Sequence, residues 1–72
     1  MINVQYDKNG EIIIQVNKDG ALNLITYLSN LLESKDTHYH LMTPSWGGNE
    51  LSEELILPNS LLVNQVRLQL VE

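Results

Sequence analysis

Hydrophobic and polar positions alternate at the start of the chain. In the segment INVQY, Ile2, Val4 and Tyr6 alternate with Asn3 and Gln5. A period of two places successive side chains on opposite faces of an extended backbone. The segment therefore predicts a half-buried β-strand.

A second strand is expected directly after a tight turn. The pair Asn9-Gly10 is a strong hairpin signal because both residues tolerate positive φ. In the segment EIIIQV that follows, Ile12, Ile14 and Val16 share one face. The pattern predicts two antiparallel strands.

The hydrophobic period changes between residues 17 and 35. Apolar side chains recur there at intervals of three and four residues: Ala21, Ile25, Leu28 and Leu32, with Leu24 and Leu31 beside them. Such a stripe predicts an amphipathic helix that packs its apolar side on the sheet. Asn17 or Asp19 can cap its start, and Lys35 suits the negative end of its dipole.

Strand patterning returns in the second half of the chain. Residues 37–42 alternate, and a loop broken by Pro44 and two glycines follows. Residues 51–57 fit either a short strand or a turn of helix, and residues 62–71 alternate most regularly. The sequence thus predicts an α+β fold of order ββαββ: a small antiparallel sheet with one helix on one face, in a single domain over residues 1–72.

The sheet face opposite the helix is expected to be polar. It collects Asn3, Gln5, Ile13, Gln15, His38, His40, Met42, Gln65, Arg67 and Gln69. No further segment remains to cover it, and an antiparallel sheet can expose one face to water.

Charge and composition narrow the classes of partner. Four basic against nine acidic residues give a net charge of −5. Because so few cations cannot neutralise a phosphate backbone, nucleic acid and anionic membranes are disfavoured as partners. A basic protein is favoured by electrostatic steering, although solubility alone explains most acidic small domains.

Cysteine usage and hydropathy indicate a cytoplasmic, soluble chain. The sequence has no cysteine, so neither a disulfide framework nor a thiolate zinc site is possible. Its first residues lack the basic and apolar regions of a secretory signal, and its apolar runs are too short to span a bilayer.

His38 and His40 are the obvious candidates for chemistry. On a strand they point to the same face, and two imidazoles can begin a metal site. Glu50, Glu53 or Glu54 would have to complete it, so we expect two solvated histidines and neither a metal nor another cofactor.

No arrangement typical of an enzyme is present. The serines lie outside a nucleophile-elbow context, and two adjacent glutamates on a strand would point apart. A chain this short also leaves little room for a deep pocket. We expect no catalytic residues and no enzyme.

The segment Trp46-Gly47-Gly48 is the most specific feature. An indole is typical of binding hot spots, and two glycines allow another backbone to approach closely. The alternative is that Trp46 folds back over the small core. Glu50, Glu53 and Glu54 follow without a nearby base, either to meet a basic partner or to form a solvated turn.

The whole stretch HYHLMTPSWGGNELSEE resembles the signature of the immunity protein 32 family of bacterial polymorphic toxin systems. The matching positions are His38, His40, Leu41, Met42, Pro44, Trp46, Gly47, Gly48, Glu50 and Leu51. The resemblance implies a cytoplasmic antidote that binds and neutralises a cognate toxin. Many such toxins are nucleases with basic surfaces, which would suit the negative charge.

The expected mechanism is occlusion of the toxin. Partner-binding candidates are His38, His40, Trp46, Gly47, Gly48, Glu50, Glu53, Glu54 and Arg67. Two alternatives stay open: a metal-binding regulator that uses the histidines, and a homodimer or larger homo-oligomer that buries its open sheet face.

Overall fold

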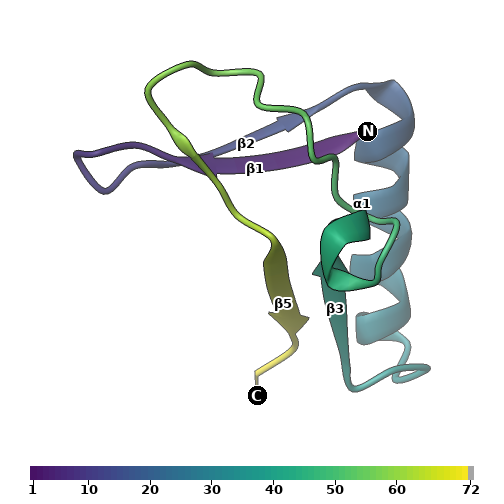
Figure 1. Ribbon diagram of the computed structural model, residues 1–72. Coiled ribbons are helices and arrows are strands. Elements are labelled where there is room, and N and C mark those ends of the chain that lie inside the picture. The colour runs from purple at the N-terminus through teal and green to yellow at the C-terminus, as the bar shows by residue number, and fades with distance from the viewer. Residues whose placement is uncertain (72) are drawn as a thin grey trace.

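Two antiparallel sheets and one helix make up the computed structural model, which describes residues 1–71 (Figure 1). The elements are β1 (Ile2–Tyr6), β2 (Ile12–Val16), α1 (Lys18–Leu32), β3 (His38–Met42), the 3-10 turn η1 (Pro44–Trp46), β4 (Leu61–Leu62) and β5 (Gln65–Gln69). The predicted α+β class is confirmed, and the predicted order ββαββ matches apart from the additional short strand β4. Within these residues no helix has both the length and the apolar character needed to cross a bilayer.

The strands divide between two sheets rather than forming one. One sheet has the order β2-β1-β4 and the other pairs β3 with β5. The regular alternation of residues 62–71 does not reveal the break at Val63 and Asn64, where the chain leaves β1 for β3. Val63 N–H donates to the Val4 carbonyl at 2.9 Å, and the Asn64 carbonyl accepts from Thr43 N–H at 3.0 Å.

The predicted hairpin joins β1 and β2. Asp7 Oδ1 accepts hydrogen bonds from the N–H groups of Asn9 and Glu11, at 2.9 and 3.0 Å. Gly10 adopts a φ of 85°, whereas Asn9 keeps a negative φ. The predicted hairpin is confirmed; of the two residues only Gly10 uses a positive φ, and the Asp7 side chain holds the turn.

The apolar core lies between β1, β3 and the chain that follows η1. Ile2, Val4, Leu41 and Leu51 form a buried cluster. Leu51 also joins the sheets through the backbone: its N–H donates to the Met42 carbonyl, and the next N–H donates to the Ile2 carbonyl. Half-buried residues pack around this cluster: Leu24, Tyr27, Tyr39, Val63, Val66 and Leu68.

The helix presents a different stripe to the core from the one that the sequence predicts. Asn17 caps it as expected, because its side chain accepts from the Gly20 N–H at 2.8 Å. However, Ile25, Leu28 and Leu32 are 59%, 50% and 72% exposed. The apolar side of this helix is wider than the surface that the small sheets offer, so the residues that pack are Leu24, Tyr27 and Leu31.

The polar face of β1 is covered, contrary to expectation. Asn3 and Gln5 are fully buried. Asn3 Nδ2 donates to the Glu54 carbonyl at 2.7 Å, and Gln5 Nε2 donates to the Leu57 carbonyl at 3.0 Å. Gln5 Oε1 accepts from the N–H groups of Ile56 and Leu57, at 3.0 and 3.1 Å. Residues 54–57, which are neither helix nor strand, thus cover this face because two side-chain amides satisfy their backbone.

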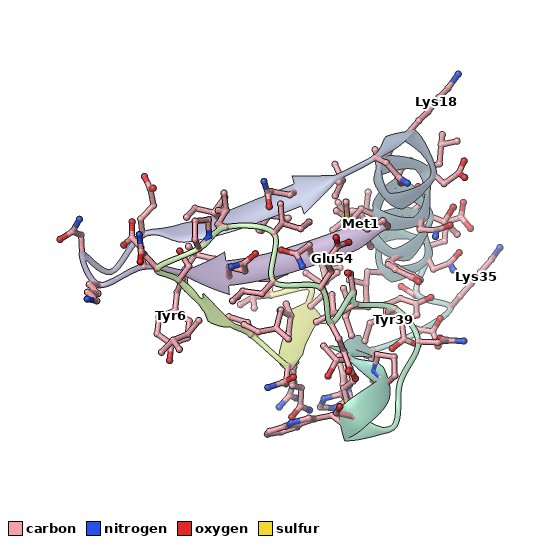
Figure 2. All side chains as sticks on the ribbon, turned by 45° about the horizontal axis from the view of Figure 1, so that its top comes forward. Met1, Tyr6, Lys18, Lys35, Tyr39 and Glu54 are labelled. Carbon is pink, nitrogen blue, oxygen red and sulfur yellow. The ribbon has the colours of Figure 1, made fainter. Side chains whose placement is uncertain are left out.

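Tyr39 fixes the helix to β3 (Figure 2). Its ring lies 4.9 Å from that of Tyr27. Its hydroxyl donates to Asp36 Oδ2 at 2.7 Å and accepts from Asn30 Nδ2 at 2.8 Å. The hydrogen bond to Asp36 raises the pKa of Tyr39 above its ordinary value of 10.0, because ionisation would remove the proton that the hydroxyl donates to the carboxylate.

Replacing Gln5 by leucine should lower the free energy of unfolding by about 3 kcal/mol, because three hydrogen bonds to the covering segment are lost. Urea denaturation followed by circular dichroism measures the change. Gln69→Leu on β5 is the matched control, since Gln69 is exposed and its replacement should change stability by less than about 0.5 kcal/mol. Equal effects of both substitutions would contradict this account of the cover.

Tyr39 should make stability depend on alkaline pH. Its pKa in the folded state is raised above the unfolded value of 10.0, so its contribution is complete below pH 10. That contribution is lost as the pH rises through the folded-state pKa. The unfolding free energy of the wild type should therefore fall more steeply above pH 10 than that of Tyr39→Phe. Parallel pH profiles for the two proteins would contradict this.

Candidate functional site

Three of the predicted binding residues share one face of the β3–β5 sheet. His40 lies directly opposite Arg67, and His38 lies opposite Gln69. Tyr39 and Leu41 point to the other face, toward the core. His40 and Arg67 are exposed and His38 is half-buried. On this sheet the prediction of a polar, solvent-facing surface is confirmed.

The two imidazole rings contact each other edge to face. Their centres are 4.8 Å apart and their planes are at 86°. Thr37 Oγ1 is 3.0 Å from His38 Nδ1, and Gln65 Nε2 is 2.9 Å from His40 Nδ1. Because the amide nitrogen of Gln65 donates, His40 Nδ1 is the acceptor of this hydrogen bond.

A metal site needs more ligands than this pair provides. In the part of the chain that the structure describes, no three His, Asp or Glu side chains gather around one point. Zinc is bound by at least three protein ligands. The two histidines alone therefore do not complete a zinc site.

The turn after β3 is held by its own backbone. The carbonyl of the buried Thr43 accepts from the N–H groups of Trp46 and Gly48, at 2.9 and 3.1 Å. The Thr43 hydroxyl donates to Asn64 Oδ1 at 2.9 Å. Trp46 occupies the last position of η1 and is 56% exposed. The structure thus places the indole outward, and the alternative in which Trp46 folds over the core is wrong.

Two of the three predicted acidic contacts bind the turn itself. Glu50 Oε1 accepts from the Met42 N–H at 3.0 Å, and Glu53 Oε1 accepts from the Ser45 N–H. Glu54 is exposed, and its main chain takes part in covering β1. The carboxylates of Glu50 and Glu53 therefore fix the shape of the turn in addition to giving it negative charge.

The two glycines play different parts. A Cβ on Gly48 would lie 2.7 Å from Met42 Cβ and 2.6 Å from Glu50 Oε1, so Gly48 allows a close approach within its own chain. Gly47 adopts a φ of 94° and has open space around it. Only Gly47 thus fits the predicted role of admitting another backbone.

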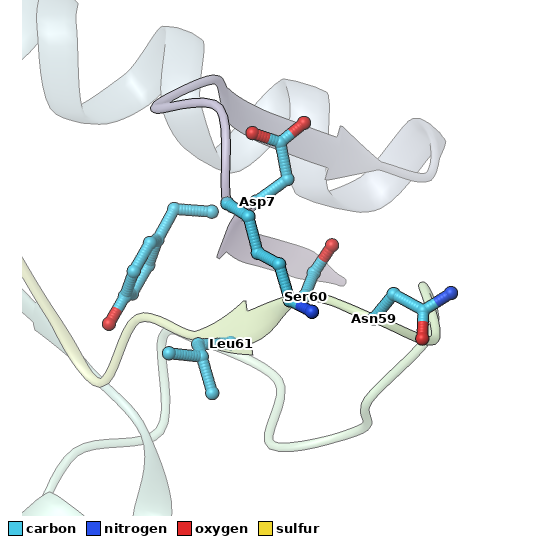
Figure 3. A pocket seen from close by; sticks show the side chains of 6 residues that line it. Asp7, Asn59, Ser60 and Leu61 are labelled. Carbon is cyan, nitrogen blue, oxygen red and sulfur yellow. The ribbon is translucent and has the colours of Figure 1, made fainter.

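The largely apolar hollow in Figure 3 lies at the far end of the β1–β2 hairpin, and sequence reasoning missed it. Its volume is about 290 Å³, and it is lined by Tyr6, Asp7, Lys8, Asn59, Ser60 and Leu61. The pairing of Tyr6 with Leu61 brings its two walls together, so no local motif could reveal it. Within this lining, Asp7 Oδ1 already accepts hydrogen bonds from the backbone of the hairpin turn.

Comparison with protein-family models, curated proteins and solved structures finds no match to this chain.

Replacing Gly48 by alanine should destabilise the protein by about 2 kcal/mol, because the new methyl group would overlap Met42 and the Glu50 carboxylate. Gly47→Ala is the matched control, with an expected loss of about 1 kcal/mol from its left-handed backbone alone. Thermal unfolding at neutral pH compares the two. A Gly48→Ala variant as stable as the wild type would show that the turn does not pack on β3 in this way.

Proposed function

We propose that the protein is an immunity protein, which binds and neutralises a cognate bacterial toxin in the cytoplasm. The resemblance of residues 38–54 to the immunity protein 32 family motivates this reading. The binding surface is the face of β3 and β5 that carries His38, His40 and Arg67, together with the turn that carries Trp46.

The observation that carries the proposal is the display of Trp46. Its side chain is 56% exposed, although indoles are among the most hydrophobic groups of a protein. The backbone beneath it is fixed by Thr43 and by the carboxylates of Glu50 and Glu53. A preorganised anchor loses little conformational freedom on binding, so more of the contact energy contributes to affinity.

The turn and the polar sheet face can act as one surface. Met42 shares its face of β3 with His40, and the same residue abuts Gly48 in the turn. A partner seated on this face would therefore meet the imidazoles, the Arg67 guanidinium and the turn together. An extended surface with an exposed aromatic anchor suits binding to another protein, which supports occlusion as the mechanism.

The negative charge of the chain indicates which class of partner it would bind. The chain has a net charge of −5, and Glu50, Glu53 and Glu54 cluster after the turn. Opposite charge accelerates encounter and excludes partners of the same sign. A toxin with a basic active-site surface, such as a nuclease, is the partner that this distribution fits best.

The test is co-expression with a candidate toxin taken from the neighbouring genes, followed by a growth assay and titration calorimetry. Trp46→Ala should weaken the complex by about 2 kcal/mol, roughly thirtyfold in dissociation constant, because a buried anchor is removed. Leu22→Ala on the helix is the matched control, since Leu22 is similarly exposed at 53% and lies outside the proposed surface. A wild-type chain that neither binds nor protects would refute the function, and equal affinities of both variants would refute the surface.

A further inference from the structure

β2 forms an open edge of the three-stranded sheet. The strand order is β2-β1-β4, so β2 pairs only with β1. In Figure 2, β2 is the outermost strand, and the helix runs from Lys18 past Met1 toward Lys35, away from the open edge. The edge is thus accessible to another strand.

The free hydrogen-bonding groups of β2 belong to its aliphatic residues. Asn17 N–H donates to the Met1 carbonyl and Asp7 N–H donates to the Glu11 carbonyl, so odd-numbered positions of β2 face β1. In an antiparallel ladder the alternate residues face the opposite way. The N–H and C=O groups of Ile12, Ile14 and Val16 therefore point outward from the sheet.

The side chains of the same three residues are uncovered. Ile12, Ile14 and Val16 are 57%, 58% and 41% exposed. They share a face with Ile2 and Val4, which the core buries, because Val16 lies opposite Ile2 and Ile14 opposite Val4. The apolar face of the sheet is therefore buried at β1 but stays exposed at β2, where no other part of residues 1–71 packs over it.

Nothing in β2 protects this edge from pairing. Natural edge strands are guarded by charges, prolines or bulges. The segment Ile-Ile-Ile-Gln-Val has no charge and no proline, and all five of its residues pair regularly with β1. The strand is a suitable template for a further strand.

We propose that β2 pairs with β2 of a second copy of this chain, antiparallel and centred on Ile14. In this register Ile12 lies opposite Val16 of the other copy, and Ile14 lies opposite itself on the two-fold axis. Every outward N–H and C=O group of the three residues then finds a partner. One continuous sheet with an aliphatic ladder across its centre is formed.

Self-pairing fits the charges at the two ends of β2. Glu11 precedes the strand and Lys18 follows it after the capping residue. An antiparallel arrangement sets the acidic end of each copy beside the basic end of the other. Because the strand itself is uncharged, no like charges meet at the axis.

The chain also exposes more surface than a compact monomer of its mass, and pairing with a second copy would cover part of that excess. A compact monomer of 8.2 kDa is expected to expose about 4500 Å². This chain exposes 5089 Å², roughly 550 Å² more than that relation gives. The excess is most of the approximately 800 Å² that each partner buries in a standard interface.

Sedimentation equilibrium of the full chain, from micromolar to millimolar concentration, tests the pairing. The wild type should approach twice its mass of 8.2 kDa. Ile14→Lys should raise the dimer dissociation constant about a hundredfold or more, because two like charges then meet at the axis. Ile25→Lys is the matched control, since Ile25 is 59% exposed on the helix and its replacement should leave the dimer intact.

Single-cysteine variants test the register in a chain that has no cysteine of its own. Ile14→Cys should form a disulfide between copies, because opposed residues have Cα atoms about 5.5 Å apart. Ile12→Cys should not crosslink with itself, since the two Cα atoms would be about 13 Å apart. A monomeric wild type, a dimer that Ile14→Lys leaves unchanged, or efficient self-crosslinking through residue 12 overturns the proposal. If the wild type is monomeric and the Ile14→Lys variant no longer binds the toxin, the proposal is also overturned, and the edge strand belongs to the toxin-binding surface instead.

Discussion

The structure depends on the hydrogen bonds by which two buried side-chain amides of β1 hold the irregular segment 54–57 against the sheet. Asn3 and Gln5 make four hydrogen bonds to the backbone of residues 54–57 and are fully buried beneath it. This face has a cost: the Asn3 and Gln15 side-chain oxygens are buried without a partner among residues 1–71. Residues 54–57 belong to no strand, so the two side-chain amides form hydrogen bonds with backbone groups that would otherwise bond to water. The cover fixes the path of the chain between the turn of Trp46 and β4.

That path is what holds the candidate site in place. Leu51 joins Met42 of β3 to the core, and Asn64 binds Thr43 from the other side. The turn between them is therefore anchored at both ends before Glu50 and Glu53 close it. A turn that is fixed by its backbone and presents an indole suits the proposed binding to another protein, and two acidic side chains are used internally to hold it.

A chain of 72 residues cannot cover all of its apolar surface. The sheets bury one flank of the helix and the β1 half of the hairpin. Ile25 and Leu28 on the helix, and Ile12 and Ile14 on β2, are left at the surface. Trp46 and the β2 edge thus lie on two separate elements, so the proposed toxin binding and the proposed pairing with a second copy would make independent demands on the molecule.

The sequence by itself determined the local elements: the hairpin at Asn9-Gly10, a helix that begins near Asn17, and the alternation that sets His38, His40 and Arg67 on one face. These follow from periodicity and capping, which act over a few residues. Only the tertiary structure decided which helix stripe is buried, that Asn3 and Gln5 are covered, and that the last strand divides at Val63. Each of these depends on contacts between segments distant in sequence, because burial is a property of what packs against a residue and not of the residue's own pattern.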